Sequence, residues 1–250
     1  MSEFNSRAFI SGCEGPQLTY DERAFFRDAQ PWGLILFRRN VVERAQIKDL
    51  IAQFRESVGR PDAPILIDQE GGRVQRLGPP HWRRYPAGAR FLDVSKGDLS
   101  AAAELARLSA RLIAHDLFEV GVTIDCAPVL DLPVEGMTDA IGDRAYARDP
   151  QSTAIIGRAF ADGLIAGGLL PVIKHIPGHG RAMVDSHKEL PFVEAPRAVL
   201  SATDFVPFRS LADLPIGMTA HIVYGGSFSF KFKIVAKRRI RIEFVNVLSK

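Results

Sequence analysis

Residues 171–187 read Pro-Val-Ile-Lys-His-Ile-Pro-Gly-His-Gly-Arg-Ala-Met-Val-Asp-Ser-His, and they hold three of the chain's six histidines. The segment begins as a short apolar strand, Val172 and Ile173, whose end delivers Lys174 and His175. The loop that follows is broken by glycine and proline, which favour neither helix nor strand. A solvated surface loop could also collect polar residues, but polar side chains placed directly after a buried strand are more typical of function. The segment therefore predicts an active-site loop on a rigid strand.

Apolar runs and helical patterns alternate along the rest of the chain. Short apolar runs predict strands at 8–11, 33–37, 64–68, 122–127, 171–174 and 216–220. One predicted helix follows a capping signal at Asn40 and Glu43 and carries Ile47, Leu50, Ile51, Phe54 and Val58 on one face. The next covers 98–120 and is ended by Gly121, and another is opened by Asp149 and Pro150, points Ile155, Ile156, Phe160 and Leu164 inward, and is closed by Gly167. The last helical stretch contains Phe205, Phe208 and Leu211. Unbroken rather than alternating apolar strands indicate a parallel sheet covered on both faces.

Composition restricts the class of protein. A chain of 250 residues with 46% hydrophobic and 24% charged residues can form one large α/β domain. Cys13 and Cys126 match no metal or redox spacing, which predicts free thiols in a reducing compartment. The N-terminus has no apolar signal segment and no run approaches the ~18 apolar residues of a membrane span, so we expect a cytoplasmic protein without membrane contact.

Charge is unevenly distributed along the chain. Residues 225–250 hold seven basic residues and one acid, Glu243, which leaves 25 basic and 28 acidic residues before them. The pI of about 9.0 therefore comes from the end of the chain, and it does not indicate a nucleic-acid partner. We predict a domain over residues 1–224 and a basic tail over residues 225–250.

Polar residues gather immediately after the predicted strands. Asp68, Glu70, Arg73 and Arg76 follow the third strand, Asp131 and Arg144 the fourth, Lys174 and His175 the fifth, and His221 the sixth. Charged groups at the carboxyl ends of several parallel strands predict a (β/α)8 barrel, because a doubly wound sheet uses one switch point. Taken singly, Asp68 could cap a turn, and Arg76 and Arg144 could each form a surface ion pair. Lys174 must leave the core at a strand end, where its ammonium needs a polar partner.

His187 and Asp185 form the pair in the sequence that is best suited to acid–base catalysis. A histidine can give and take a proton near neutral pH, and a nearby carboxylate can set its tautomer and raise its pKa. The alternative is a metal hydrolase. Its candidate ligands would be His175, His179, His187, Asp185 and Asp68.

Several motifs in order carry a resemblance to a known family. They are Ile-Asp-Gln-Glu-Gly-Gly-Arg-Val-Gln-Arg, Ala-Pro-Val-Leu-Asp, Gly-Asp-Arg-Ala-Tyr, Lys-His-Ile-Pro-Gly-His-Gly followed by Asp-Ser-His, and Met-Thr-Ala-His-Ile-Val-Tyr. Over residues 8–224 the chain resembles the bacterial β-N-acetylhexosaminidases of glycoside hydrolase family 3. The resemblance implies a TIM-type barrel that removes terminal N-acetylglucosamine from muropeptides during peptidoglycan recycling, with retention and without a metal or cofactor. It assigns sugar binding to Asp68, Arg76, Arg144, Lys174 and His175, and acid/base catalysis to His187 with Asp185 as its partner.

Residues 225–250 depart from this family. Its members continue through a seventh strand that ends in a nucleophilic Asp, whereas this segment contains no Asp and changes abruptly in composition. We therefore expect a truncated or frameshifted chain, an incomplete barrel with about six of eight strands, and impaired hydrolysis. A sugar-binding protein without catalysis and a metal hydrolase remain as alternatives. The expected partner is a small saccharide or muropeptide, and the expected state is a monomer.

Overall fold

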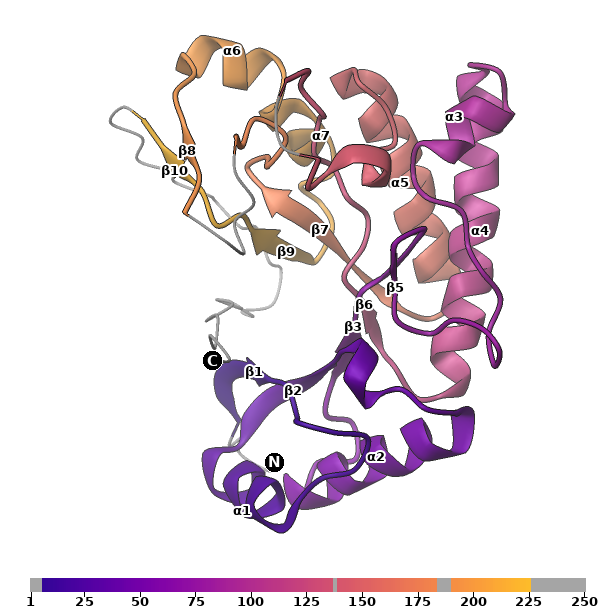
Figure 1. The fold of residues 1–250 in the computed structure, drawn as a ribbon, viewed down its shortest axis with the longest axis vertical. Helices are drawn as coiled ribbons and strands as arrows, with labels where there is room; N and C mark the ends of the chain where they lie inside the picture. The colour runs from indigo at the N-terminus through magenta and orange to yellow at the C-terminus, as the bar shows by residue number, and fades with distance from the viewer. Residues whose placement is uncertain (1–5, 137–138, 184–189, 226–250) are drawn as a thin grey trace.

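The computed structural model describes residues 6–136, 139–183 and 190–225. Its centre is a six-stranded sheet in which every neighbouring pair is parallel and the strand order follows the chain (Figure 1). The strands of this sheet are β1 (Arg7–Ser11), β2 (Pro31–Leu36), β3 (Ile65–Ile67), β6 (Ile124–Asp125), β7 (Leu170–Ile176) and β9 (Ile216–Thr219). Outside it, β4 (Gln69–Gly71) pairs antiparallel with β5 (Val74–Gln75), and β8 (Phe192–Val193) pairs parallel with β10 (Val223–Tyr224). The predicted α/β class with a parallel sheet is confirmed, and the sheet curves into a half-barrel.

Helices connect the strands. They are α1 (Tyr20–Ala29), α2 (Arg44–Ser57), α3 (Arg90–Val94), α4 (Leu99–Glu119), α5 (Pro150–Ala166), α6 (Arg197–Ala202) and α7 (Phe205–Ser210), with 3-10 turns η1 (Arg38–Asn40) and η2 (Gly142–Arg144). The predicted helix ends at Asp98 and Asp149 are confirmed, because each carboxylate caps a free backbone N–H of the first turn. Gly121 follows the end of α4 with φ of +92°, a conformation that favours glycine.

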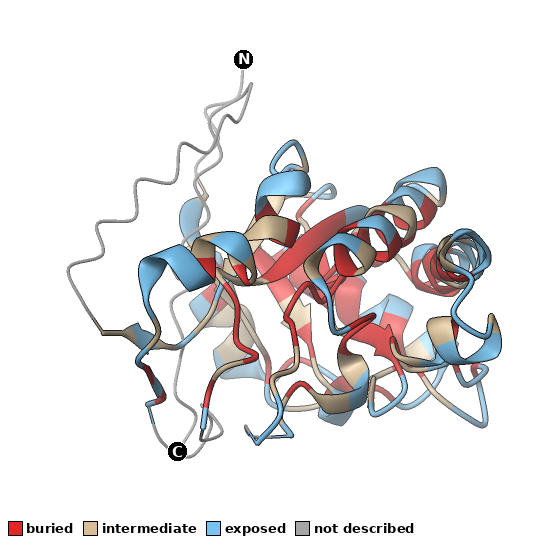
Figure 2. Cartoon of the chain, turned by 90° about the horizontal axis from the view of Figure 1, so that it is seen from above, coloured by how far each residue is buried: buried red, intermediate tan, exposed pale blue. Residues whose placement is uncertain are grey.

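The sheet has two different faces. Its outer face packs on the helices, and buried residues are red in Figure 2. Leu34, Ile65 and Ile67 belong to this main core. Its inner face carries a second cluster around Leu66 and Val172, against which partly buried apolar side chains pack. The expectation of cover on both faces is met on the outer face only: helices cover that face, whereas inner-face side chains such as Ile35 and Ile216 are only partly buried among the described residues.

Three local predictions are wrong. Asn40 does not cap α2; its buried amide donates to the carbonyls of Cys13 and Gly15 instead, and Glu43 takes the N-cap position without a side-chain hydrogen bond. Ile155 does not point inward, since it is 47% exposed. The strand predicted over 171–174 extends over Leu170–Ile176, so Lys174 and His175 lie within it.

Two further sequence predictions concern thiols and membranes. Cys13 and Cys126 are free thiols, as predicted, and both are buried. Within the described ranges, every helix is too short or too polar to cross a membrane. The boundary predicted at 224 stays a prediction, because residues 226–250 lie outside the described residues.

Candidate active site

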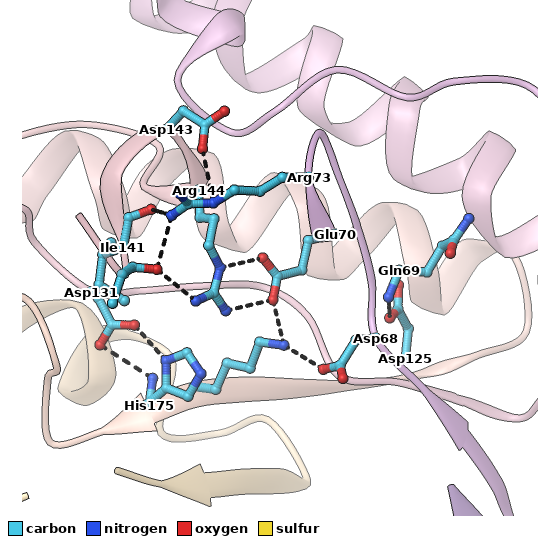
Figure 3. Close-up of polar contacts among 12 residues, drawn as sticks. Asp68, Gln69, Glu70, Arg73, Asp125, Asp131, Ile141, Asp143, Arg144 and His175 are labelled. Atoms are coloured by element: carbon cyan, nitrogen blue, oxygen red, sulfur yellow. Dashed lines mark hydrogen bonds and ion pairs between the residues drawn. The ribbon is translucent and has the colours of Figure 1, made fainter. Parts of the chain in front are cut away.

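A row of paired charges lies between the end of β3 and the second half of β7 (Figure 3). Lys174 of β7 is 1% exposed, and its Nζ lies 2.8 Å from Asp68 Oδ1 and 2.5 Å from Glu70 Oε1. Asp68 follows β3 directly, and Glu70 comes from the hairpin of β4 and β5 that begins at the next residue. The strand end and the hairpin thus place one carboxylate on each side of the ammonium.

Two arginines complete the row. Arg144 faces Glu70 with two parallel hydrogen bonds of 2.8 Å, from Nε to Oε2 and from Nη2 to Oε1. Arg76 Nη2 donates to Asp68 Oδ2 at 3.0 Å. Positive and negative charges therefore alternate in the order Arg76, Asp68, Lys174, Glu70 and Arg144. We call these five residues the charge row.

The ionisation of the charge row follows from its pairing. Burial alone would raise the pKa of Asp68, but the cations of Lys174 and Arg76 outweigh it and hold that pKa far below its usual range. Burial opposes ionisation of Glu70 as well, and Lys174 with Arg144 lowers its pKa. Burial would lower the pKa of Lys174, yet the two carboxylates raise it. All of these groups are charged at neutral pH.

Arg144 is positioned by a loop that Arg73 anchors. The guanidinium of Arg73 donates to the carbonyls of Asp139 at 2.7 Å and Ile141 at 3.0 Å, and it forms an ion pair with Asp143 at 3.4 Å (Figure 3). These contacts hold the segment that ends in η2, and Arg144 is the last residue of η2. Arg73, although it follows the same strand as Asp68, therefore acts outside the charge row.

Gln69 holds the hairpin that carries Glu70 and Arg76. Its buried side chain accepts the backbone N–H groups of Arg76 and Leu77 and donates to the Leu77 carbonyl. Its own backbone N–H donates to Asp125 Oδ1 at 3.0 Å, and Asp125 Oδ2 is buried without a hydrogen-bond partner within the described part of the chain. Burial raises the pKa of Asp125 well above its ordinary value, which favours the neutral form of this carboxyl.

His175 turns away from the charge row toward Asp131. Its Nδ1 lies 2.6 Å from Asp131 Oδ2, and the Asp131 side chain is completely buried (Figure 3). Burial would raise the pKa of Asp131, but the neighbouring His175 and the hydrogen bonds it accepts lower it. Lys174 and His175, although consecutive, thus belong to two different polar groups.

The loop after β7 is fixed at its beginning. A Cβ on Gly180 would collide with the Leu132 carbonyl oxygen, so only glycine fits there. Arg181 Nε donates to the buried Asp204 at 2.8 Å, and the Tyr224 hydroxyl donates to the Gly178 carbonyl. These contacts hold the first residues of the loop, up to Arg181, against the rest of the domain.

The structure brings Asp68, Arg76, Arg144 and Lys174 into one network, with His175 beside it. His221 follows β9 at the same edge of the sheet and is exposed. The predicted pair His187 and Asp185 lies outside the described residues.

Sequence reasoning missed two members of the site. Glu70 was one acid in a polar run, and Asp131 was one strand-end acid among several. The Gln-Glu-Gly-Gly run was the signal for Glu70, because paired glycines indicate a tight hairpin at that point.

The metal alternative named Asp68 among its candidate ligands. In the structure Asp68 forms ion pairs with Arg76 and Lys174. The described residues hold no cluster of three or more metal-ligating side chains.

A curved parallel sheet with charged side chains at the carboxyl ends of its strands is typical of the class of barrel-type α/β folds. Comparison with known sequences specifies the family. The model of the Glycosyl hydrolase family 3 N terminal domain matches residues 12–228, and the chain belongs to this family.

Relatives and solved structures agree with the family. Over 212 residues the chain is 42% identical to a beta-hexosaminidase of Methylococcus capsulatus, covering 84% of this chain and 61% of the relative. It is 39% identical over 217 residues to a beta-hexosaminidase of Alkalilimnicola ehrlichii, covering 86% and 62%. The crystal structure of NagZ from Neisseria gonorrhoeae in complex with N-trifluoroacetyl-D-glucosamine matches with a TM-score of 0.81 and 34% identity, covering 88% and 64%. The chain thus spans less than two thirds of these proteins.

Proposed function

We propose that the chain forms the sugar-binding part of a glycosidase that removes terminal, non-reducing β-linked N-acetylglucosamine. One observation carries the proposal: in a member of this family, Lys174 is buried between two carboxylates where the strands of the sheet end. The beta-hexosaminidase names of the relatives, and the glucosamine derivative bound to the Neisseria protein, support this substrate class. The six strands would then be part of an eight-stranded barrel, and the natural substrate a peptidoglycan fragment.

The proposed sugar contacts are Asp68, Arg76, Arg144, Lys174 and His175. An ammonium has three N–H donors, and Lys174 uses two of them on carboxylates, which leaves one for a sugar oxygen. Arg144 likewise keeps N–H groups beyond the fork that it makes with Glu70. Charged donors that are already fixed in place bind hydroxyls without a further ordering cost. They also discriminate against ligands that lack those hydroxyls.

The proposed chemistry uses His187 as acid and base, with Asp185 as the carboxylate that supports it. In the retaining reaction the acid protonates the leaving oxygen, and a nucleophile attacks the anomeric carbon from the opposite side. Asp125 and Asp131 are poor candidates for that nucleophile. Both are completely buried and accept backbone N–H groups, so neither carboxylate can reach a sugar carbon.

We therefore expect a polypeptide of these 250 residues to bind N-acetylglucosamine weakly and to hydrolyse its glycosides slowly. Residues 225–250 contain no Asp that could serve as the nucleophile. Loss of one essential group costs several powers of ten in rate. The 2-acetamido oxygen of the substrate would be the remaining internal nucleophile.

Two measurements on the 250-residue chain test the proposal. Calorimetry measures N-acetylglucosamine binding, and release of the aryl group from an aryl N-acetyl-β-glucosaminide measures hydrolysis. Asp68→Asn should weaken binding by about tenfold or more, because it removes a charged hydrogen-bond partner. Asp93→Asn is the matched control, since Asp93 also pairs with an arginine but is exposed on α3. Equal effects of the two variants would contradict the assignment of Asp68.

Sugar binding without hydrolysis is the second candidate function, favoured by the lack of Asp in residues 225–250. It predicts binding without aryl release, even after long incubation. Because the Neisseria protein has also been solved in complex with zinc ion, each assay is repeated with a chelator. Aryl release that the chelator abolishes would indicate a metal hydrolase instead.

A further inference from the structure

Asp131 directs all of its observed hydrogen bonds to the end of β7 and the loop that follows it. Its Oδ1 accepts the backbone N–H of His175 at 3.3 Å and that of His179 at 2.7 Å. Its Oδ2 lies 2.6 Å from His175 Nδ1. Because the side chain is completely buried, water does not compete for these oxygens. One carboxylate therefore fixes both the backbone and the imidazole of His175.

The contact with Asp131 decides which nitrogen of His175 faces a ligand. A carboxylate can only accept at neutral pH, so Nδ1 must carry a proton and donate it. In the neutral ring the other nitrogen, Nε2, then has a free lone pair. No hydrogen bond to Nε2 is made by the residues that the structure describes, and the side chain is 18% exposed beside Lys174.

We propose that Asp131 is a positioning residue that locks His175 in the tautomer with Nδ1 protonated, so that Nε2 accepts a hydrogen bond from a sugar hydroxyl. This inference rests on the proposed function for its ligand. The charge row offers ammonium and guanidinium donors to sugar oxygens, and a locked Nε2 adds an acceptor next to them. A site that offers both donors and an acceptor can recognise a sugar hydroxyl, which accepts hydrogen bonds through its oxygen and donates one through its proton.

Asp131→Asn separates the tautomer from the backbone support. The amide oxygen of the new side chain can still accept the two backbone N–H groups, whereas its NH₂ group would face His175 Nδ1. Nδ1 then has to accept, and the proton moves to Nε2. Nitrogen-15 NMR of histidine-labelled protein, at a pH that keeps the ring neutral, should show Nδ1 protonated in the unmodified chain and Nε2 protonated in the variant.

A matched control and a double variant test whether Asp131 affects sugar binding through His175. Asp204→Asn changes another buried carboxylate, which pairs with Arg181 of the loop after β7, and it should leave the His175 tautomer unchanged. Binding of N-acetylglucosamine should fall about tenfold or more in Asp131→Asn. In a His175→Ala background the same change should weaken binding no further, because Asp131 acts through His175.

Each outcome decides the inference. A ring with Nε2 protonated in the unmodified chain overturns it, and this measurement does not depend on whether any variant folds. Additive losses in the double variant also overturn it, since Asp131 would then act only on the backbone. If the unmodified chain binds no sugar, the proposed function fails, and the tautomer measured by NMR alone decides the role of Asp131.

Discussion

Replacing Lys174 by Met removes the central cation of the charge row and keeps a side chain of similar length. The partly exposed Asp68 and the buried Glu70 would then keep one arginine each instead of sharing an ammonium. Removing one partner of a buried ion pair costs about 3–5 kcal/mol. Because Arg76 and Arg144 stay in place, we expect the low end of that range, about 3 kcal/mol lower free energy of unfolding at neutral pH.

The pH dependence of this loss gives a sharper test. In the unmodified chain the pKa values of Asp68 and Glu70 lie below their ordinary 3.8 and 4.5. Their contribution to stability is therefore present above about pH 5 and is lost as the pH falls through the lowered values. In Lys174→Met both pKa values rise, so the two proteins should converge in stability as the pH falls below about 4.

Urea unfolding followed by circular dichroism at neutral and acidic pH measures both effects. Lys48→Met is the matched control, because Lys48 lies exposed on α2, and it should change stability by less than about 0.5 kcal/mol. A Lys174→Met loss below about 1 kcal/mol, or a loss that is equal at both pH values, would refute the reasoning.

Four other changes test three separate parts of the molecule. In an active chain that contains the nucleophile, His187→Ala should lower kcat by about 10²–10⁴, and the loss should be smallest for leaving groups that need no proton. Asp185→Asn should lower kcat as well. If the variants lose sugar binding instead of turnover, His187 is a sugar contact. Asp125→Asn should change the free energy of unfolding by less than about 1 kcal/mol, because the neutral carboxyl resembles an amide; a loss near 3 kcal/mol in urea unfolding would mean an ionised Asp125. Gly180→Ala should destabilise by several kcal/mol in the same assay, since its Cβ collides with the Leu132 carbonyl, and a neutral effect would contradict this packing.

The sheet could be predicted because each of its strands is a short apolar run, but strand lengths depend on partners elsewhere in the chain. Ile176 became part of β7 because it pairs with Thr219 of β9, which no local pattern reveals. Ile155 was misplaced for a related reason. Helix α5 approaches α4 through Gly163, where a Cβ would collide with the Arg107 carbonyl. A periodicity of large apolar residues does not detect a contact made by glycine.

The site was predictable where chemistry demanded a partner. A lysine on a buried strand needs a polar partner, as expected, and the structure provides Asp68. Which further acid joins it was not predictable, because Glu70 reaches Lys174 only through the hairpin that Gln69 holds. Asp131 was indistinguishable from other strand-end acids, since its role depends on how the backbone turns at His175 and His179.

The strand order β1-β2-β3-β6-β7-β9 has a consequence for how the chain acquires its structure. Every strand of this sheet pairs with the sheet strand that left the ribosome just before it, so each new βα unit adds to an existing edge. Each pairing still spans a long connection, since Leu66 of β3 pairs with Ile124 of β6 and Val172 of β7 pairs with Ile216 of β9, and such long-range parallel pairings form slowly. Only the joining of β1 to a later strand would require the two ends of the sheet to meet. The sheet can therefore grow in the order of synthesis, one strand at a time.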